Sequence, residues 1–340
     1  MEKKAEPSRI VVIGASLGGL AALRGVIAAF PPNLDAIVLI AMHIGANHSL
    51  LPELLAPHTS LPVEHARHDV VLRSSVILVA PPDRHLMVQD GRTRLSNGPK
   101  ECFTRPAIDP LFRSAALEFG PRAIAVILTG DLDDGAAGAV AVRACGGAVI
   151  VQDPADSVAP SMPSSCLRAV PSAVIAQLDN IGETIVKTVA APLKATTTEE
   201  DRSRLEIEAR ISLTGAASPD DLDFIGKRST LTCPECGGVI WRVGTDAPLR
   251  YRCHTGHAFS NLGLRYAQEC GLEESLWTSM RKAEECAVLA ACQAEVAKAK
   301  GDEAGADAAE KQHVRHKLLE ESLRRFLREN SKRWRTGATE

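Results

Sequence analysis

The sequence predicts an α/β protein whose main domain is a doubly wound, mainly parallel sheet, followed by a small zinc-ribbon-like unit and a helical pair. Short, nearly continuous apolar runs recur through the first 190 residues, and helix-like segments separate them. Such runs are typical of strands that are buried on both faces of a parallel sheet. The predicted strands are Arg9–Ala15, Ala36–Ala41, Val76–Ala80, Ala123–Leu128 and Ala148–Val151; the predicted helices are Leu20–Ala29, Ser49–Ala56, Pro110–Phe119 and Ala136–Cys145.

The smaller elements follow from local turn signals and changes of composition. Leu86–Val88 and Thr93–Leu95 flank Asp90-Gly91 and predict a β-hairpin attached to the sheet. Apolar and polar residues alternate from Leu205 to Leu213, which favours an extended segment, with a helix as the alternative. The predicted parts are the α/β domain (8–190), a polar linker (191–228), the zinc-ribbon-like unit (229–260) with a hairpin of Val239–Val243 and Leu249–Arg252, and two antiparallel helices (261–333) broken near Gly301–Gly305.

Composition narrows the classes of function. The 340 residues include 39 Lys and Arg against 42 Asp and Glu, so no nucleic acid or anionic membrane is expected as a partner. No apolar run approaches the roughly 18 residues that a membrane span needs. A signal peptide is disfavoured because glycines interrupt the apolar stretch from Ile10 to Leu23. Nine cysteines, an odd number, fit a reducing compartment, and the expected location is the cytoplasm.

The turn Gly14-Ala-Ser-Leu-Gly-Gly19 lies between the first predicted strand and a helix. It fits the pattern G-x-S-x-G, in which glycines allow a sharp turn that exposes a serine hydroxyl. The helix start also supplies unpaired N–H groups that can stabilise an oxyanion. A nucleotide-binding turn is an alternative, but its fingerprint needs glycine where Ser16 stands and an acidic residue where the chain has Met42-His43. Ser16 is therefore the candidate nucleophile, with a purely structural turn as the other alternative.

Two further segments place polar residues after predicted strands. His43 follows the second strand, and Asp131, Asp133 and Asp134 follow the fourth. Catalytic groups in open α/β sheets gather at the carboxyl ends of strands, where a carboxylate can orient an imidazole and complete a Ser–His–Asp triad. Asp133 or Asp134 could instead only cap the following helix. The chain order Ser, His, Asp differs from that of α/β-hydrolases, which indicates another fold with the same chemistry.

Together these segments resemble the catalytic domain of CheB-type protein-glutamate methylesterases of bacterial chemotaxis, over about residues 8–190. Beyond the GAS-x-GG turn, the similarity includes four segments in order: APPDRHL (80–86), RPAIDPLF (105–112), LTG…DGA (128–136) and QDP…PSMP (152–163). The resemblance implies that Ser16 is the nucleophile, His43 the base and Asp134 the carboxylate, without a catalytic cofactor. It also implies methylated glutamates of chemoreceptor cytoplasmic helices as substrates, with glutamine deamidation by the same route and other chemosensory proteins as further partners.

The chain departs from this family in several respects, among them Met42, which stands where glutamine usually precedes the histidine. Leu17 stands where the family often has threonine, so the backbone N–H of Leu17 is the expected oxyanion donor. Asp131 stands where it often has methionine. A receiver domain usually precedes the catalytic domain, and only nine residues precede Ile10 here, so control by phosphorylation within this chain is not expected. A catalytically weak regulatory or binding module of a chemosensory pathway is the alternative function.

A Cys/His cluster lies in the predicted zinc-ribbon-like unit. Cys233, Cys236, Cys253 and His257 form the spacing C-x2-C-x16-C-x3-H, which suits a tetrahedral structural zinc ion held by two knuckles. His254 is the competing fourth ligand, and a reduced, metal-free cluster is the alternative. Because a segment this small has little core, loss of the metal is expected to unfold residues 230–260 and leave the α/β domain folded.

Overall fold

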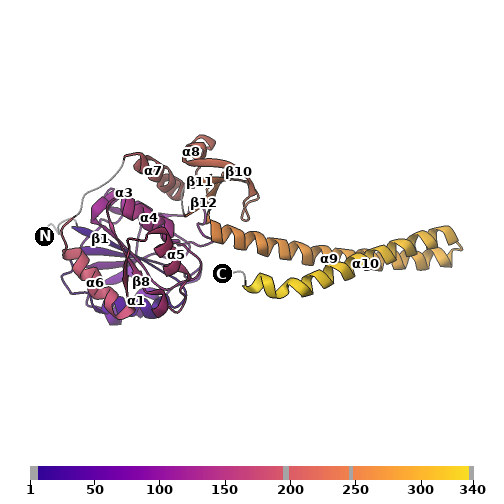
Figure 1. Ribbon diagram of the computed structural model, residues 1–340, viewed down its shortest axis with the longest axis horizontal. Coiled ribbons are helices and arrows are strands. Elements are labelled where there is room, and N and C mark those ends of the chain that lie inside the picture. Colours follow the sequence, from indigo (N-terminus) through magenta and orange to yellow (C-terminus); the bar gives the residue numbers. More distant parts are fainter. Residues whose placement is uncertain (1–6, 194–198, 245–247, 337–340) are drawn as a thin grey trace. The chain divides into compact units, whose positions relative to one another are not determined.

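The computed structural model describes residues 7–193, 199–244 and 248–336 and divides the chain into two compact units (Figure 1). The larger unit ends at Gly263 and the smaller unit begins at Leu264. The predicted boundaries at residues 190 and 228 do not separate compact units, because the segment between them packs against the α/β part.

The larger unit contains a seven-stranded sheet in the order β3-β4-β2-β1-β7-β8-β9, and every neighbouring pair in it is parallel. Its strands are β1 (Arg9–Ala15), β2 (Ala36–Met42), β3 (Val63–His65), β4 (Val76–Val79), β7 (Ala123–Ile127), β8 (Ala148–Gln152) and β9 (Val174–Ala176). The five predicted strands are confirmed to within one residue. The two edge strands, β3 and β9, were not predicted, because three residues are too few to show an apolar run.

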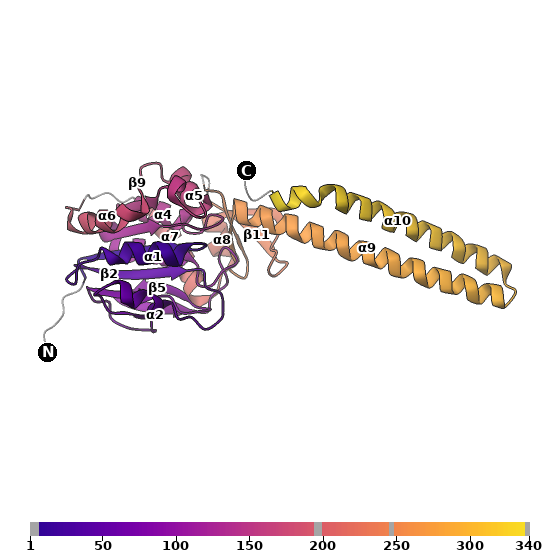
Figure 2. The ribbon, with the colours of Figure 1, turned by 90° about the horizontal axis from the view of Figure 1, so that it is seen from below.

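Helices cover both faces of this sheet (Figure 2). Along β1, Val11 and Ile13 pack on one face with α1 (Gly19–Ala28), α2 (Leu51–Leu55) and α6 (Leu178–Ala190). Ile10 and Val12 pack on the other face with α3 (Ile108–Phe119), α4 (Ala136–Ala144) and α5 (Ser161–Ala169). The sheet is therefore doubly wound, as predicted, and burial on both faces explains its continuous apolar strands.

The order of the strands reverses at β1, which lies between β2 and β7. The chain builds outward from β1 through β2 on one side and from β7 through β8 and β9 on the other. Ligands of open α/β sheets bind at the carboxyl ends of the strands beside such a switch point. Residues that follow β1, β2 and β7 therefore meet at the expected place for a functional site.

Two features beside this sheet complete the larger unit. The predicted hairpin is confirmed as β5 (His85–Gln89) and β6 (Arg92–Ser96), which form a separate two-stranded sheet packed on α3. The second feature is a four-stranded antiparallel sheet, in which the strands lie side by side in the order of the sequence. They are β10 (Gly226–Thr232), β11 (Val239–Val243), β12 (Arg250–Cys253) and β13 (Ala258–Ser260).

The segment predicted as an extended linker is helical. It forms α7 (Glu199–Thr214), which packs on α3, and α8 (Pro219–Ile225). The buried positions of α7 are Leu205, Glu208, Ile211 and Ser212, a helical spacing that includes two polar residues. The alternation of apolar residues was misleading because the sequence pattern could not show that Glu208 and Ser212 are buried.

A buried ionic network joins α7 and β12 to the α/β part. Glu101 pairs with Arg113 of α3 and with Arg252 of β12, and all three side chains are about 1% exposed. Arg252 also lies 3.7 Å from Glu208 of α7. Burial alone would raise the pKa of Glu101, but the charges of Arg113 and Arg252 outweigh burial and hold this pKa well below its ordinary value.

Replacing Glu101 with glutamine is expected to destabilise the larger unit by about 3–5 kcal/mol at pH 7, because the buried guanidinium groups of Arg113 and Arg252 lose the carboxylate that they share. A carboxylate with a lowered pKa stabilises the fold above its unfolded pKa of about 4.3, so the difference between wild type and variant should shrink below about pH 4. Urea unfolding, followed by hydrogen exchange of the α3 amides, measures both effects. Asp69→Asn, which removes an exposed partner of Arg92 and Arg94, is the control and should change little.

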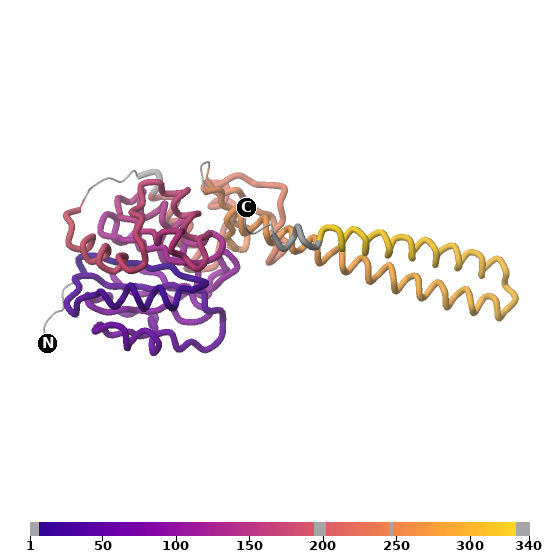
Figure 3. The backbone as a smooth tube through the Cα atoms, turned by 60° about the horizontal axis from the view of Figure 1, so that its bottom comes forward, coloured from indigo at the N-terminus to yellow at the C-terminus, as the bar shows by residue number. Residues whose placement is uncertain are grey.

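The smaller unit is an antiparallel pair of long helices, as predicted (Figure 3). α9 (Asn261–Ala299) begins three residues before the unit boundary, and α10 (Glu303–Thr336) follows a break at residues 300–302. Small side chains of α9 (Ala283, Ala287, Ala290 and Ala294) are buried in this unit. His313 of α10 lies with Nδ1 2.8 Å from the carbonyl oxygen of Ala287. No helix among the described residues is long and apolar enough to cross a membrane.

Candidate active site

Ser16 lies immediately after β1, at the turn into α1. Its backbone N–H donates to the carbonyl oxygen of Thr129 (3.0 Å), which ties the turn to the end of β7. Gly18, the N-cap of α1, has a φ of 79°, and a Cβ atom there would lie 2.8 Å from Cβ of Val158. Only glycine suits both requirements. The turn therefore has the geometry that the G-x-S-x-G pattern predicts.

His43 follows β2 and faces Ser16. Its backbone N–H donates to the carbonyl oxygen of Ala15 (3.2 Å), so the position of the histidine is set by the β1–β2 pairing. The imidazole Nδ1 lies 3.1 Å from Oγ of Ser16, and Nε2 lies 2.8 Å from Oδ2 of Asp134. The His43 side chain is 16% exposed. The three predicted triad residues thus form one hydrogen-bonded chain.

Asp134 is buried, and three hydrogen-bond donors contact its carboxylate. Besides His43, its carboxylate accepts hydrogen bonds from the backbone N–H groups of Ile108 (2.7 Å) and Asp109 (3.1 Å). These are the first two residues of α3, so the positive end of the helix dipole faces the carboxylate. These donors were not predicted from the sequence, although they belong to the RPAIDPLF segment, which is part of the resemblance.

The side chain of Asp109 also lies in this buried region. Its Oδ1 accepts a hydrogen bond from the N–H of Gly138 (2.7 Å). Burial and the nearby charge of Asp134 raise the pKa of Asp109 to about 7. Asp109 therefore carries less negative charge near the triad at neutral pH than an ordinary aspartate would.

The other two aspartates of the DLDD segment do not reach His43. Asp131 is exposed, and Asp133 accepts a hydrogen bond from the hydroxyl of Ser260 (2.5 Å). Burial raises the pKa of Asp133 to about 6. The N-cap of α4 is Gly135, without a side-chain cap, so the capping alternative for Asp133 and Asp134 is wrong.

An open groove of about 590 Å³ lies beside Ser16 and His43. The turn before α1 and the first residues of this helix, from Leu17 to Ala21, line it together with Met42 and Arg24. The side chain of Leu17 is 56% exposed. Gly130 lies next to Ser16, and a Cβ atom at Gly130 would come within 2.8 Å of Cβ of Ser16 and 2.2 Å of Sδ of Met162. The groove leaves room for a substrate carbonyl next to the serine hydroxyl.

The hydrogen bonds determine how the imidazole can act. A carboxylate only accepts, so Nε2 of His43 carries the proton that is donated to Asp134. Nδ1 is then unprotonated in the neutral ring and can accept the proton of the Ser16 hydroxyl. This is the arrangement of a nucleophile, a general base and an orienting carboxylate.

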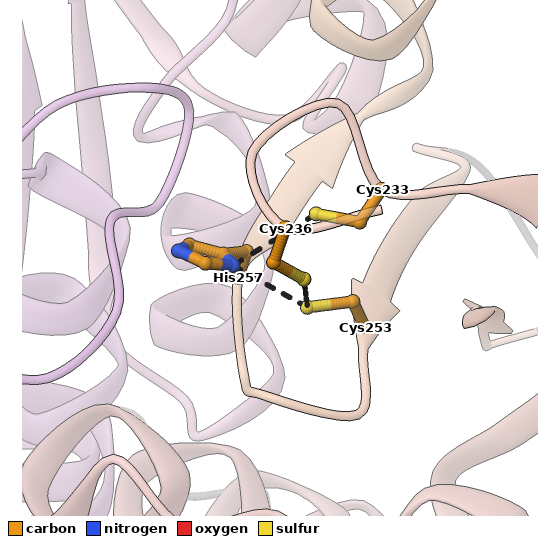
Figure 4. A group of neighbouring side chains, drawn as sticks. All are labelled: Cys233, Cys236, Cys253 and His257. Atoms are coloured by element: carbon orange, nitrogen blue, oxygen red, sulfur yellow. Dashed lines mark hydrogen bonds between the residues drawn. The ribbon is translucent and has the colours of Figure 1, made fainter. Parts of the chain in front are cut away.

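The predicted metal ligands also come together, at one end of the four-stranded sheet (Figure 4). The sulfur atoms of Cys236 and Cys253 are 3.7 Å apart, and Nδ1 of His257 lies 3.8 Å from Cys233 Sγ and 3.5 Å from Cys253 Sγ. The four ligand atoms lie within 4.8 Å of one another. His254, the competing ligand, lies against Gly238 instead, where a Cβ atom would be 1.9 Å from its ring.

Comparisons with known proteins point to one family. The profile of the CheB methylesterase family matches residues 11–185. A protein of Anaeromyxobacter dehalogenans named protein-glutamate methylesterase/protein-glutamine glutaminase 2 is 42% identical over 149 residues, 44% of either chain. The protein-glutamate methylesterase FrzG of Myxococcus xanthus is 36% identical over 189 residues, 55% of this chain and 57% of that protein. The chain spans about half the length of these relatives.

The fold agrees with this match. The crystal structure of the Thermotoga maritima CheB methylesterase catalytic domain superposes with a TM-score of 0.51 and 31% sequence identity. The superposition covers 53% of this chain and 97% of that domain. The α7–β13 segment and the helical pair follow the part of the chain that the family profile matches.

Proposed function

The chain belongs to the CheB methylesterase family, and from this premise we propose that it is a serine hydrolase that demethylates glutamate methyl esters on chemoreceptors. The observation that carries the proposal is the hydrogen-bonded chain from Ser16 through His43 to Asp134, next to an open groove. The names of the relatives, which include protein-glutamate methylesterase, support the choice of substrate.

The proposed mechanism has two half-reactions, and in each of them His43 acts first as a base and then as an acid. His43 Nδ1 takes the proton of Ser16 as Oγ attacks the γ-ester carbonyl carbon, and Asp134 stabilises the imidazolium that forms. The backbone N–H of Leu17 stabilises the oxyanion. His43 then returns the proton to the departing methoxide, so methanol leaves and an acyl-enzyme remains. Water, deprotonated by His43, hydrolyses the acyl-enzyme to glutamate and restores Ser16.

The same route would deamidate a glutamine side chain, with ammonia as the leaving group. The relative from Anaeromyxobacter dehalogenans is also named a protein-glutamine glutaminase, which supports this second substrate. Among the described residues that line the groove, Arg24 is the only one that is Arg, Lys, Asp or Glu. The groove therefore suits a neutral ester or amide group.

The proposed partners are the methylated cytoplasmic helices of chemoreceptors and other chemosensory proteins, and the proposed location is the cytoplasm. No disulfide joins any of the nine cysteines, all of which lie in the described part of the chain, and this supports a reducing compartment.

Methanol release from a methyl-labelled receptor fragment tests the proposed activity. The wild-type protein should release labelled methanol in proportion to enzyme concentration, and Ser16→Ala should release no more than buffer. If the two proteins release methanol at the same rate, the hydrolase proposal fails. Binding of the receptor fragment without release would then favour the regulatory module.

A further inference from the structure

We propose that Cys233, Cys236, Cys253 and His257 bind one zinc ion, and that the loop closed by the metal supports the segment behind the catalytic carboxylate. Zinc binding is independent of the proposed esterase activity. Only the expected effect of the metal on turnover rests on the proposed function. The metal-ligand module is defined here as β10 to β13 with the loops between them, residues 226–260.

Three of the six distances between the ligand atoms match the edges of a zinc tetrahedron, and all six are within 4.8 Å. With metal–sulfur bonds of about 2.3 Å and metal–nitrogen bonds of about 2.1 Å, a tetrahedral site has S···S edges of about 3.8 Å and S···N edges of about 3.6 Å. The corresponding distances here are 3.7 Å between Cys236 and Cys253, and 3.8 and 3.5 Å from Nδ1 of His257 to Cys233 and Cys253. A disulfide is excluded at 3.7 Å, because bonded sulfur atoms are about 2.05 Å apart.

The chemistry of the ligands selects the same metal. Three sulfur ligands and one imidazole suit zinc and offer none of the oxygen atoms that calcium and magnesium require. All four positions of the tetrahedron come from protein, so the site has no open position for catalysis. Cys233 and Cys253 are buried, whereas Cys236 is exposed, so metal can enter from one side.

The module has little apolar core near the ligands. Its apolar cluster consists of Trp241 and Val243 of β11 packed on residues of α7 and α8, and residues 233–238 and 253–257, which carry the ligands, contribute no side chain to it. Burial alone therefore contributes little to the order of those loops. A metal that joins them would supply the missing stabilisation, as in other small zinc units.

The neighbours of Cys253 and His257, the second pair of ligands along the chain, form hydrogen bonds with the segment that precedes α3. Next to Cys253, Arg252 donates to the carbonyl oxygen of Gly256 (2.8 Å) within the ligand loop and to Glu101 (3.1 Å) outside it. Next to His257, Ala258 accepts a hydrogen bond from the N–H of Cys102 (2.9 Å).

Two further contacts follow along β13. The ring of Phe259 packs on Phe103 with centroids 5.1 Å apart, and Ser260 donates to Asp133 (2.5 Å). The module thus contacts residues 101–103, which precede α3, and Asp133, the residue next to the catalytic carboxylate in the chain.

Residues 101–103 lead directly to the donors of Asp134. Glu101 pairs with Arg113 of α3, and the first two N–H groups of α3 bind the carboxylate of Asp134. A shift of this helix start relative to Asp134 would rotate the carboxylate away from Nε2 of His43. The expected consequence is a lower kcat with little change in KM, because the groove for the substrate is built from α1 and the end of β2.

Elemental analysis tests the metal site. Protein purified without chelator should contain one zinc ion per chain. Cys236→Ser should lose most of it, and the exposed Cys286→Ser, outside the cluster, should retain it. The metal site would be overturned if the wild type contained no zinc, or if Cys236→Ser left the zinc content per chain unchanged.

Hydrogen exchange and kinetics on full-length protein test the coupling. Removal of zinc by a chelator should speed exchange of amides 100–109 and lower kcat by about 10- to 100-fold, with KM within about 2-fold. Added zinc should restore both, and β1 amides should stay protected throughout. Unchanged exchange at 100–109 after zinc loss refutes the coupling, whether or not the protein is an esterase. Inactive zinc-loaded protein contradicts only the proposed function.

Discussion

Ser16→Ala and His43→Ala are each expected to lower kcat/KM for ester hydrolysis by roughly 10⁴- to 10⁶-fold, the largest effects expected for this protein. Either change breaks the 3.1 Å contact through which the hydroxyl loses its proton. The kcat/KM of the double variant should be little lower than that of the worse single variant, because members of a triad act as a unit.

Initial rates of methanol release over a range of substrate concentrations measure these effects. His48→Ala is a matched control, because His48 is exposed and lies in the loop that follows His43. It should keep wild-type kinetics. Independent, multiplicative losses in the double variant would contradict the assignment of Ser16 and His43 to one catalytic unit.

Asp134→Asn is expected to lower kcat by about 10⁴-fold, and Asp134→Ala should also be severely impaired. The carboxamide can donate its NH₂ to Nε2 of His43, which would place the ring proton on Nδ1 and remove the base that faces Ser16. In the flipped orientation of the carboxamide, the NH₂ would face the N–H groups of Ile108 and Asp109. Those groups are donors and need an acceptor, so this orientation is unfavourable. The variant should therefore bind substrate but fail to activate the serine.

Asp133→Asn and Asp131→Asn are the matched controls for Asp134→Asn, since all three aspartates belong to one turn. Asp131 is exposed and Asp133 bonds to Ser260, so both changes should be much milder. Separate determination of kcat and KM for the three variants measures the difference. An Asp133→Asn variant as impaired as His43→Ala, together with an active Asp134→Asn, would show that the wrong carboxylate was assigned.

The central sheet and the grouping of Ser16, His43 and Asp134 were predictable from the sequence because both depend on how parallel strands are arranged. Strands that are buried on both faces must be almost entirely apolar, so β1, β2, β4, β7 and β8 are visible as local patterns. Parallel strands also bring their carboxyl ends to one edge, so Ser16, His43 and Asp134 could be placed together although 91 residues separate the last two. Sequence could not choose among the three aspartates without the resemblance, because the choice depends on where each side chain points.

Tertiary structure alone decided the features that depend on polar partners distant in the chain. Glu101 and Arg252 are 151 residues apart, and Ser260 and Asp133 are 127 apart. A charged or polar residue can be buried only when a partner compensates its lost hydration, and no local pattern records that partner. This is why α7 was predicted as part of a linker, and why the donors of Asp134 and the attachment of the metal-ligand module to them became apparent only in the folded protein.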